Sequence, residues 1–252
     1  SDVKDVCGDY PAVLGCELGG LELGHDKNID GVPFDKMREQ IQAHYQRGGI
    51  ITISWHPHNP VTAGTAWEIE GDAVAASLSG GKEHAKMKLW LQRTVNFMKS
   101  LKTTNGEAIP IIFRPWHEMN GDWFWWGTKS CTPQQYIKLF KMTVDYFRQA
   151  KLTQIVWSYS PNASSDDTPE RFFTFYPGDK YVDLLGVDLY QHTTKEEFIK
   201  QGQQEMGIMH DYAEKHNKLY AITEGGYRNT PDPQWYSYTL LPALQGYRPC
   251  YV

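Results

Sequence analysis

Two glutamates occupy places in the sequence from which a pair of carboxyl groups can act together. Glu118 lies a few residues after the apolar run 109–113, and Glu224 directly follows the apolar run 219–223. Carboxyl groups at the ends of two strands that are distant in sequence can face each other across a cleft. One can then protonate a leaving oxygen while the other attacks an anomeric carbon, which is the chemistry of glycoside hydrolysis. Taken alone, a glutamate at a strand end can also be merely a salt-bridge partner.

Aromatic residues are concentrated around the first glutamate. Four of the nine tryptophans lie between positions 116 and 126, in a polar segment that contains glycine. Aromatic rings can stack on the C–H faces of sugars while polar groups bind the hydroxyls, so a sugar cleft needs both kinds of side chain. The candidate rings are Trp67, Trp116, Trp123, Phe124, Trp125 and Trp126, and the candidate polar groups are His56, His117, Asn120, Asn162 and Tyr190. The competing interpretation is that alternate residues of the run 123–126 pack against the rim of the fold.

The segments that must position these residues alternate between short apolar runs and longer stretches of helical period. Strands are predicted at residues 11–18, 50–55, 109–113, 154–158, 182–189 and 219–223, and a further strand is predicted to begin at Pro249. Helices are predicted at residues 33–47, 82–101, 133–150, 195–216 and 234–246, with a short helix from Pro169. Gly48 and Gly49 close the first helix, and Thr132 is placed to cap the third.

This alternation predicts a parallel sheet whose functional residues lie at the carboxyl ends of the strands. Polar and aromatic residues do gather directly after the predicted strands, at 55–59, 114–121, 158–162, 188–190 and 223–226. An open, doubly wound sheet would follow the same rule, but no glycine-rich phosphate loop follows the first strand. The sequence therefore predicts an α/β fold of the (β/α)8 barrel type.

Composition and charge argue against some kinds of binding partner. The 252 residues carry a net charge of −5 without a run of Lys and Arg, which argues against binding to nucleic acid. No stretch reaches about 18 apolar residues, so no membrane span is expected, and no signal-peptide pattern is visible. The four cysteines have neither CxxC nor zinc spacing, so free thiols are predicted, with a disulfide as the alternative.

One long motif resembles the signature of a known family. The run FRPWHEMNGDWFWWG at 113–127 is similar to the signature of glycoside hydrolase family 26, the β-mannanase family. Other segments resemble the same family, namely ISWH at 53–56 with Asn59, Pro60 and Trp67, DLLGVDLY at 183–190, and ITEGG at 222–226. The resemblance covers nearly the whole chain.

The resemblance implies a role for each residue of the site. It implies a barrel in which Glu118 is the acid/base of a retaining double displacement and Glu224 is the nucleophile. His117 matches a residue that steers the acid and contacts the sugar, and Tyr190 matches a tyrosine near the nucleophile. Substrate binding is implied for His56, Trp67, His117, Trp123 and Tyr190, with Arg114, Asn120 and Trp126 in support. From its place at a buried strand end, Arg114 is also expected to hydrogen-bond Glu224 and hold it ionised.

The two glutamates are expected to differ in protonation. Glu118 must begin the reaction protonated, although a free glutamate has a pKa of about 4.3. Walls formed by Trp116 and Trp123, together with the nearby charge of Glu224, are expected to raise the pKa of Glu118.

The strand count departs from the family pattern. Glu118 follows the third predicted strand and Glu224 follows the sixth, each one fewer than the resemblance implies. We therefore expect residues 1–252 to form one catalytic domain that lacks the first strand of the barrel and most of the eighth. Such a barrel would have an open seam and two exposed strand edges.

The implied function is endo-acting, retaining hydrolysis of β-1,4-mannosidic bonds in mannan, galactomannan or glucomannan. The resemblance implies a monomer without a cofactor or metal, and a secreted or cell-envelope location because the polymer cannot enter a cell. Three alternatives stay open: a β-glucanase or β-xylanase of the same family, a carbohydrate-binding barrel without activity, and a metal-dependent barrel hydrolase. For the last, His56 and His58 form an H-x-H motif at a strand end, which His117, Asp188 and His192 could complete.

Overall fold

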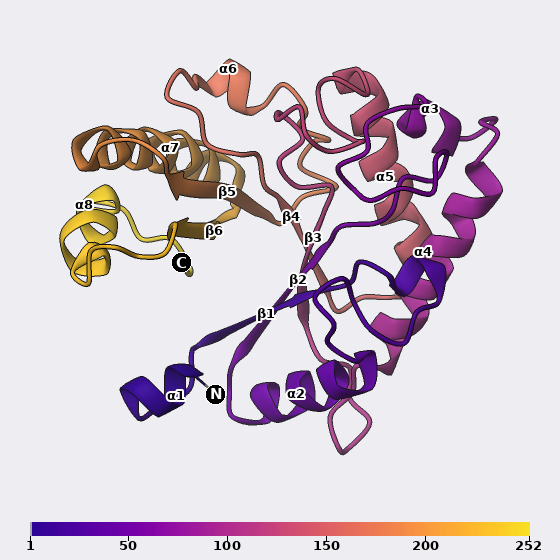
Figure 1. The fold of residues 1–252 in the computed structure, drawn as a ribbon, viewed down its shortest axis with the longest axis horizontal. Coiled ribbons are helices and arrows are strands. Elements are labelled where there is room, and N and C mark those ends of the chain that lie inside the picture. The colour runs from indigo at the N-terminus through magenta and orange to yellow at the C-terminus, as the bar shows by residue number, and fades with distance from the viewer. Residues whose placement is uncertain (1) are drawn as a thin grey trace.

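Six parallel strands form one curved sheet. In the computed structural model, which describes residues 2–252, the order of the strands in the sheet is their order in the sequence (Figure 1). The strands are β1 (Val13–Glu17), β2 (Ile50–Trp55), β3 (Ile111–Pro115), β4 (Ile155–Tyr159), β5 (Leu184–Gln191) and β6 (Leu219–Tyr227). Every neighbouring pair is parallel, so all the carboxyl ends lie at one edge of the sheet. The prediction of an incomplete (β/α)8 barrel, with β1 and β6 as its outer strands, is confirmed.

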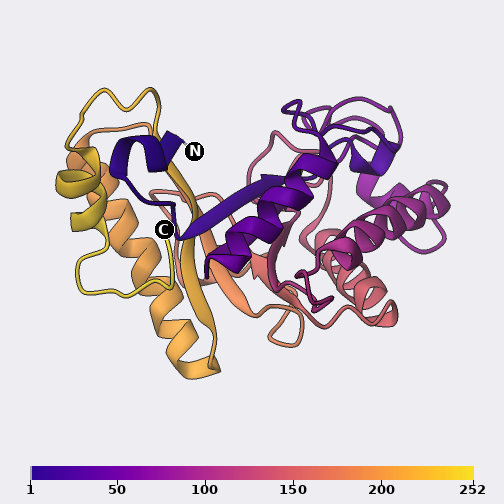
Figure 2. The same cartoon turned by 90° about the horizontal axis from the view of Figure 1, so that it is seen from below.

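Helices connect the strands and lie along the outer side of the sheet (Figures 1 and 2). The long ones are α2 (Phe34–Gln46), α4 (His84–Ser100), α5 (Pro133–Gln149) and α7 (Lys195–His216). The short ones are α1 (Asp2–Cys7), η1 (Leu21–Leu23), α3 (Ala73–Ser77) and α6 (Pro169–Phe172). Among residues 2–252, no helix combines the length and the apolar character that a membrane crossing requires.

The ends of the helices follow from local chemistry. Thr132 accepts a hydrogen bond from the backbone of Gln135, whose side chain accepts one from Thr132 in return, so that a capping box starts α5. The same pair of bonds links Thr194 and Glu197 at the start of α7. Helix α2 is followed by Gly48, which has a φ of 86° in the left-handed region that glycine adopts at little cost.

The core lies on both faces of the sheet. All five residues of β3 are buried, as expected for a parallel strand that is covered on one face by helices and on the other by the barrel interior. The helices contribute apolar faces to the same core, for example Met87, Leu91 and Val95 of α4. Within residues 2–252 all four cysteines are free, in agreement with the prediction from their spacing.

The C-terminal part of the chain differs from the prediction. A regular α-helix over the whole of 234–246 is wrong: the helix found there is shorter, and its π-helical segment η2 (Tyr236–Leu240) continues directly into the short α8 (Leu241–Ala243). Pro242 in α8 has no N–H to continue a regular hydrogen-bond ladder. The strand predicted from Pro249 is also wrong, since residues 249–252 form no strand. They approach β6 through the hydrogen bond from Cys250 N to Tyr220 O, 2.8 Å long.

Candidate active site

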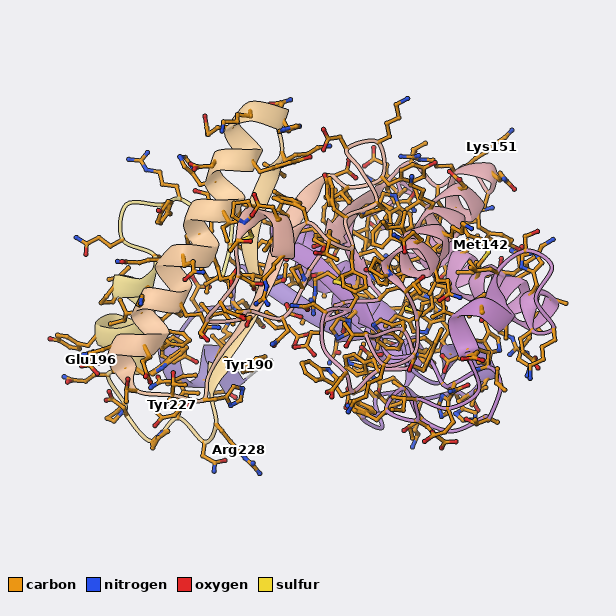
Figure 3. All side chains as sticks on the ribbon, turned by 90° about the horizontal axis from the view of Figure 1, so that it is seen from above. Met142, Lys151, Tyr190, Glu196, Tyr227 and Arg228 are labelled. Carbon is orange, nitrogen blue, oxygen red and sulfur yellow. The ribbon has the colours of Figure 1, made fainter. Side chains whose placement is uncertain are left out.

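The predicted site residues meet at the carboxyl ends of the strands. Arg114 lies in β3, Glu118 in the loop that follows it, and Glu224 in β6, while Tyr190 lies near the end of β5. Figure 3 shows Tyr190 at the same end of the molecule as Tyr227, which the register places on the neighbouring strand. The parallel sheet therefore brings together residues that are more than 100 positions apart in the sequence.

A buried guanidinium lies at the centre of the site. Arg114 donates from Nη1 to both oxygens of Asp188, at 3.0 and 3.2 Å, and from Nη2 to Oε1 of Glu224. Burial alone would lower the pKa of Arg114, but the carboxylates of Asp188 and Glu224 outweigh it and raise that pKa further above its ordinary value. The guanidinium is therefore a permanent positive charge. The predicted hydrogen bond from Arg114 to Glu224 is confirmed.

Glu224 is held from two sides. Its Oε1 faces Arg114, and its Oε2 accepts a hydrogen bond of 3.0 Å from the hydroxyl of Tyr190. The register of β5 and β6 shifts here, since Val187 pairs with Ile222 while Asp188 pairs with Glu224. Such a bulge turns the side chain that follows it, which places the Glu224 carboxylate between β3 and β5.

Glu118 has the opposite electrostatic environment. Burial, followed by the negative charge of Glu224, raises the pKa of Glu118, as predicted. The indole N–H of Trp123 donates to Oε2 of Glu118 at 2.9 Å and partly offsets that rise. Trp116, the other predicted wall, is fully buried and packs against Trp55 in the core.

The loop that carries Glu118 has an unusual backbone. Trp116 and Glu118 have φ values of 58° and 54°, in the left-handed region that bulky residues rarely adopt. Three hydrogen bonds hold this conformation: from Tyr136 to the carbonyl of Trp116, from Trp126 to the carbonyl of His117, and from the N–H of Glu118 to the carbonyl of Ser160. Local strain that the surroundings impose in this way is typical of functional loops.

Most of the aromatic residues expected to contact a ligand are part of the core instead. Exposures are 0% for Trp116, Trp125 and Trp126 and 3% for Phe124, so these rings cannot stack on a ligand. They pack on one another because the loop 116–126 folds back beneath the site. Trp126 nevertheless supports the site through its bond to His117. Two rings remain accessible: Trp123 is partly exposed, and Trp67, which is 52% exposed, stacks on His56.

Two histidines connect β2 with the catalytic loop. Nε2 of His56 lies 3.0 Å from Nε2 of His117, and the latter atom lies 3.9 Å from Oε1 of Glu224. Complete burial, followed by the charge of Arg114, lowers the pKa of His117 well below its ordinary value, so the ring of His117 is neutral. Nδ1 of His56 lies 2.8 Å from Oε2 of Glu17 at the end of β1.

Asn120 and Asn162 hydrogen-bond to each other, so the amide of Asn120 is not available to a ligand. The amide of Asn120 donates to the carbonyl of Asn162 at 2.7 Å, and its oxygen accepts from the N–H of Asn162 at 2.8 Å. This pair of bonds joins the loop after β3 to the loop after β4. Asn120 therefore supports the site, as predicted, but its polar atoms are already used.

Sequence reasoning missed Glu17 as a site residue and assigned Asp188 only to a candidate metal site. Both stand at the carboxyl ends of strands, and that position was the signal that could have identified Glu17. Tyr136 was also missed, and no pattern marks it, because it acts on the loop through a single hydrogen bond. Ser160 lies in the polar segment 158–162, but it acts through its backbone carbonyl, which no residue type marks.

The histidines and the aspartate proposed as metal ligands do not all come together in one site. His56 and His58 turn to different carboxylates, since Nδ1 of His58 lies 2.7 Å from Glu22 while His56 faces Glu17. Within residues 2–252, the histidine and carboxylate atoms that do cluster belong to His117, Asp188 and Glu224, within 4.8 Å of one another. The guanidinium of Arg114 already binds both carboxylates of that cluster. A cation therefore occupies the position that a metal ion would take, and these residues do not fit one.

Fold and site together define a parallel α/β barrel with two unlike carboxyl groups at its carboxyl-terminal face, and comparison with known proteins agrees. The model of glycosyl hydrolase family 26 matches residues 1–222. The chain is 33% identical to a mannan endo-1,4-beta-mannosidase of Bifidobacterium adolescentis, over 89% of this chain and 23% of that protein. It is 30% identical to a mannan endo-1,4-beta-mannosidase of Bacillus subtilis, over 75% of this chain and 52% of that protein. A solved family 26 β-mannanase of Bacteroides ovatus matches with a TM-score of 0.97 at 43% identity, over 100% of this chain and 73% of that one.

The chain belongs to glycosyl hydrolase family 26. It spans about a quarter of the length of the Bifidobacterium relative and about half of that of the Bacillus relative.

Proposed function

We propose that this protein hydrolyses β-1,4-mannosidic bonds with net retention of configuration. In the proposed reaction Glu118 protonates the leaving oxygen, and Glu224 attacks the anomeric carbon to form a covalent glycosyl-enzyme. Glu118 then removes a proton from the water that releases the sugar. The observation that carries the proposal is the difference between the environments of the two carboxyl groups: Glu118 is partly buried near a negative charge, and Glu224 is paired with Arg114.

The surroundings of Glu224 support its role as nucleophile. Arg114 and Tyr190 each donate one hydrogen bond to its carboxylate, which stabilises the negative charge and fixes the direction of attack. Tyr190 is 37% exposed, so its hydroxyl lies at the boundary between the buried site and the solvent. Both donors would remain in contact with the carboxyl oxygens when the ester forms.

We propose that the accessible rings and the two histidines bind the polymer. The partly exposed Trp123 and the exposed Trp67 offer faces on which sugar rings can stack. His117 lies beside Glu224 and His56 lies beside His117, which places both near the reacting carbon. Their ring nitrogens already contact Glu17 and each other, and Nδ1 of His117 is buried, so a sugar hydroxyl would replace one of these contacts. Mannan is proposed as the polymer because the relatives above are named as mannanases. A β-glucan or β-xylan substrate would require a different fit at the C2 hydroxyl of the sugar.

The roles of the glutamates can be tested with an activated aryl β-mannoside, whose leaving group needs no proton. We expect Glu224→Ala to abolish turnover of every glycoside. Glu118→Ala should lose activity on the polymer but still form the intermediate from the aryl glycoside, and added azide should release it as the β-mannosyl azide. Glu107→Ala, which removes an exposed carboxylate before β3, serves as the control and should behave as the parent protein. If azide instead rescues Glu224→Ala with inverted configuration, the two roles are exchanged.

The substrate proposal needs a separate measurement. The parent protein should release reducing ends from β-1,4-mannan much faster than from β-1,4-glucan or β-1,4-xylan. A preference for either of the other polymers would overturn mannan while leaving the catalytic roles intact. Binding to mannan without release of reducing ends would support the non-catalytic alternative.

We also propose that the protein is a monomer that works outside the cytoplasm, where a polysaccharide can reach it. The support is the polymeric nature of the proposed substrate. Light scattering of the purified protein, and assay of mannan hydrolysis by intact cells against lysed cells, would test the two statements.

A further inference from the structure

Glu17 has a carboxylate on which every contact comes from a hydrogen-bond donor. Its Oε1 accepts from the backbone N–H groups of Gly19 and His56, at 2.6 and 2.7 Å. Its Oε2 accepts from the hydroxyl of Ser54 at 2.6 Å and lies 2.8 Å from Nδ1 of His56. Burial would raise the pKa of Glu17, but the bonds from His56 and Ser54 outweigh it and lower the pKa below its ordinary value. Glu17 is therefore ionised and acts only as an acceptor.

This fixes where a proton must lie on His56. Because the carboxylate cannot donate, Nδ1 of His56 must carry the hydrogen of the 2.8 Å contact. Nδ1 carries this hydrogen whether the His56 ring is neutral or a cation. The other nitrogen, Nε2, faces Nε2 of His117 at 3.0 Å, and two ring nitrogens at that distance must share one proton.

A series of contacts through His56 and His117 connects Glu17 at the end of β1 with Glu224. His117 is neutral and fully buried, and its Nε2 lies 3.9 Å from Oε1 of Glu224. Glu17, Ser54, Arg114 and Glu224 line one cavity, so the first strand and the sixth face the same space. The close approach requires glycine at position 19, where a Cβ would lie 2.7 Å from the carbonyl of His56 and 3.0 Å from Oε1 of Glu17.

We propose that Glu17 is a positioning residue for the reaction: it holds the proton of His56 on Nδ1 and thereby orients His56 and His117 beside Glu224. This inference rests on the proposed function for its effect on catalysis. The position of the proton itself does not depend on that function. At metal sites, carboxylates that orient a histidine typically contribute tenfold to a hundredfold to affinity or activity, and we expect an effect of that order here.

The geometry suggests a variant that moves the proton of His56 from Nδ1 to Nε2 while the side chains keep their positions. In Glu17→Gln the amide oxygen must stay on the two backbone N–H groups, which have no other acceptor at that place. The amide N–H2 then replaces Oε2. Ser54 can accept from it and donate to the carbonyl of Cys16, which is 3.3 Å away. Nδ1 of His56 must accept as well, so its proton moves to Nε2, and the proton of the neutral His117 ring then moves from Nε2 to Nδ1.

The test is 15N NMR of the histidine rings in the intact protein, together with kinetics on an aryl β-mannoside. We expect a protonated Nδ1 on His56 in the parent protein and an unprotonated Nδ1 in Glu17→Gln. The variant should lose roughly tenfold or more in kcat, because the proton order of His56 and His117 beside Glu224 changes while every side chain of the site keeps its place. Ser54→Ala removes the other donor to the same oxygen and should keep the parent tautomer.

An unprotonated Nδ1 in the parent protein would overturn the proposal without any variant. A reversed tautomer with unchanged kcat would show that Glu17 is structural only. If the parent protein is inactive on every glycoside while the NMR result holds, the proposed function fails and the proton assignment stands.

Discussion

A buried pair of carboxyl groups behind the site allows a quantitative prediction about stability. Glu205 of α7 is fully buried, and Asp167, in the loop after β4, is 7% exposed. The N–H of Ser164 donates to both, at 3.0 Å to Asp167 and 3.3 Å to Glu205. Among the described residues, Oε2 of Glu205 meets no N–H or O–H donor, and we expect it to share a proton with Asp167. Burial, followed by the charge of Asp167, raises the pKa of Glu205 from 4.5 to about 9.

The direction of this pKa shift decides whether stability rises or falls with pH. The folded protein keeps the proton on Glu205 up to about pH 9, whereas the unfolded chain releases it near pH 4.5. The stabilisation is therefore complete below pH 4.5 and is lost progressively up to pH 9. At about 1.4 kcal/mol for each pH unit, the loss is about 3 kcal/mol at pH 7.

Glu205→Gln should remove that loss, because the amide N–H donates to Asp167 at every pH as the carboxylic acid does. The free energy of unfolding should exceed that of the parent protein by about 3 kcal/mol at pH 7, with the difference vanishing near pH 4.5. Urea unfolding at pH 5, 7 and 8.5 measures this difference. Glu214→Gln, an exposed change on the same helix, controls for net charge. A Glu205→Gln protein that is no more stable than its parent at pH 7 and 8.5 would refute the shared proton.

Three further outcomes follow from the site. Trp123→Phe removes the indole donor that lowers the pKa of Glu118, so the alkaline limb of the kcat/KM profile should move to higher pH; a shift to lower pH would contradict the assignment. Tyr190→Phe should reduce kcat/KM roughly tenfold to a hundredfold, with unfolding by urea unchanged, because it removes one hydrogen bond to a carboxylate. Trp116→Ala should instead destabilise the fold by about 3–5 kcal/mol, as measured by urea unfolding, since its ring is entirely in the core.

The strands and long helices could be predicted from the sequence because their signals are local. The predicted strand at 50–55 has the bounds of β2, and the predicted helix at 195–216 has those of α7. The apolar runs are bounded by proline, glycine and capping residues, and each of these acts over a few positions. At 234–246 the same local pattern predicted a helix but not its π-helical turn or its shorter extent, because packing and Pro242 decide the conformation there.

The positions of Glu118 and Glu224 followed from the rule for parallel strands, but the functions of their neighbours did not. Nothing local distinguishes the accessible Trp123 from the buried Trp125 and Trp126, because the fold of the loop decides which ring faces the solvent. Likewise, the contact of Glu17 with His56 joins positions 39 apart through the pairing of β1 with β2. Contacts of that kind depend on strand register, which a single sequence does not specify.

The charges of the site account for why one carboxyl group can serve as acid and then as base. Arg114 pairs with Asp188 and Glu224, so a negative charge on Glu118 would face Glu224 without a guanidinium partner of its own. The proton on Glu118 is therefore favoured as long as Glu224 is ionised. In the proposed reaction, formation of the ester at Glu224 removes the negative charge that raises the pKa of Glu118, while Arg114 keeps its positive charge. The pKa of Glu118 should then fall at the step where that group must accept a proton from water. The same electrostatic interaction between the two carboxyl groups thus favours the acid in the first half of the reaction and the base in the second.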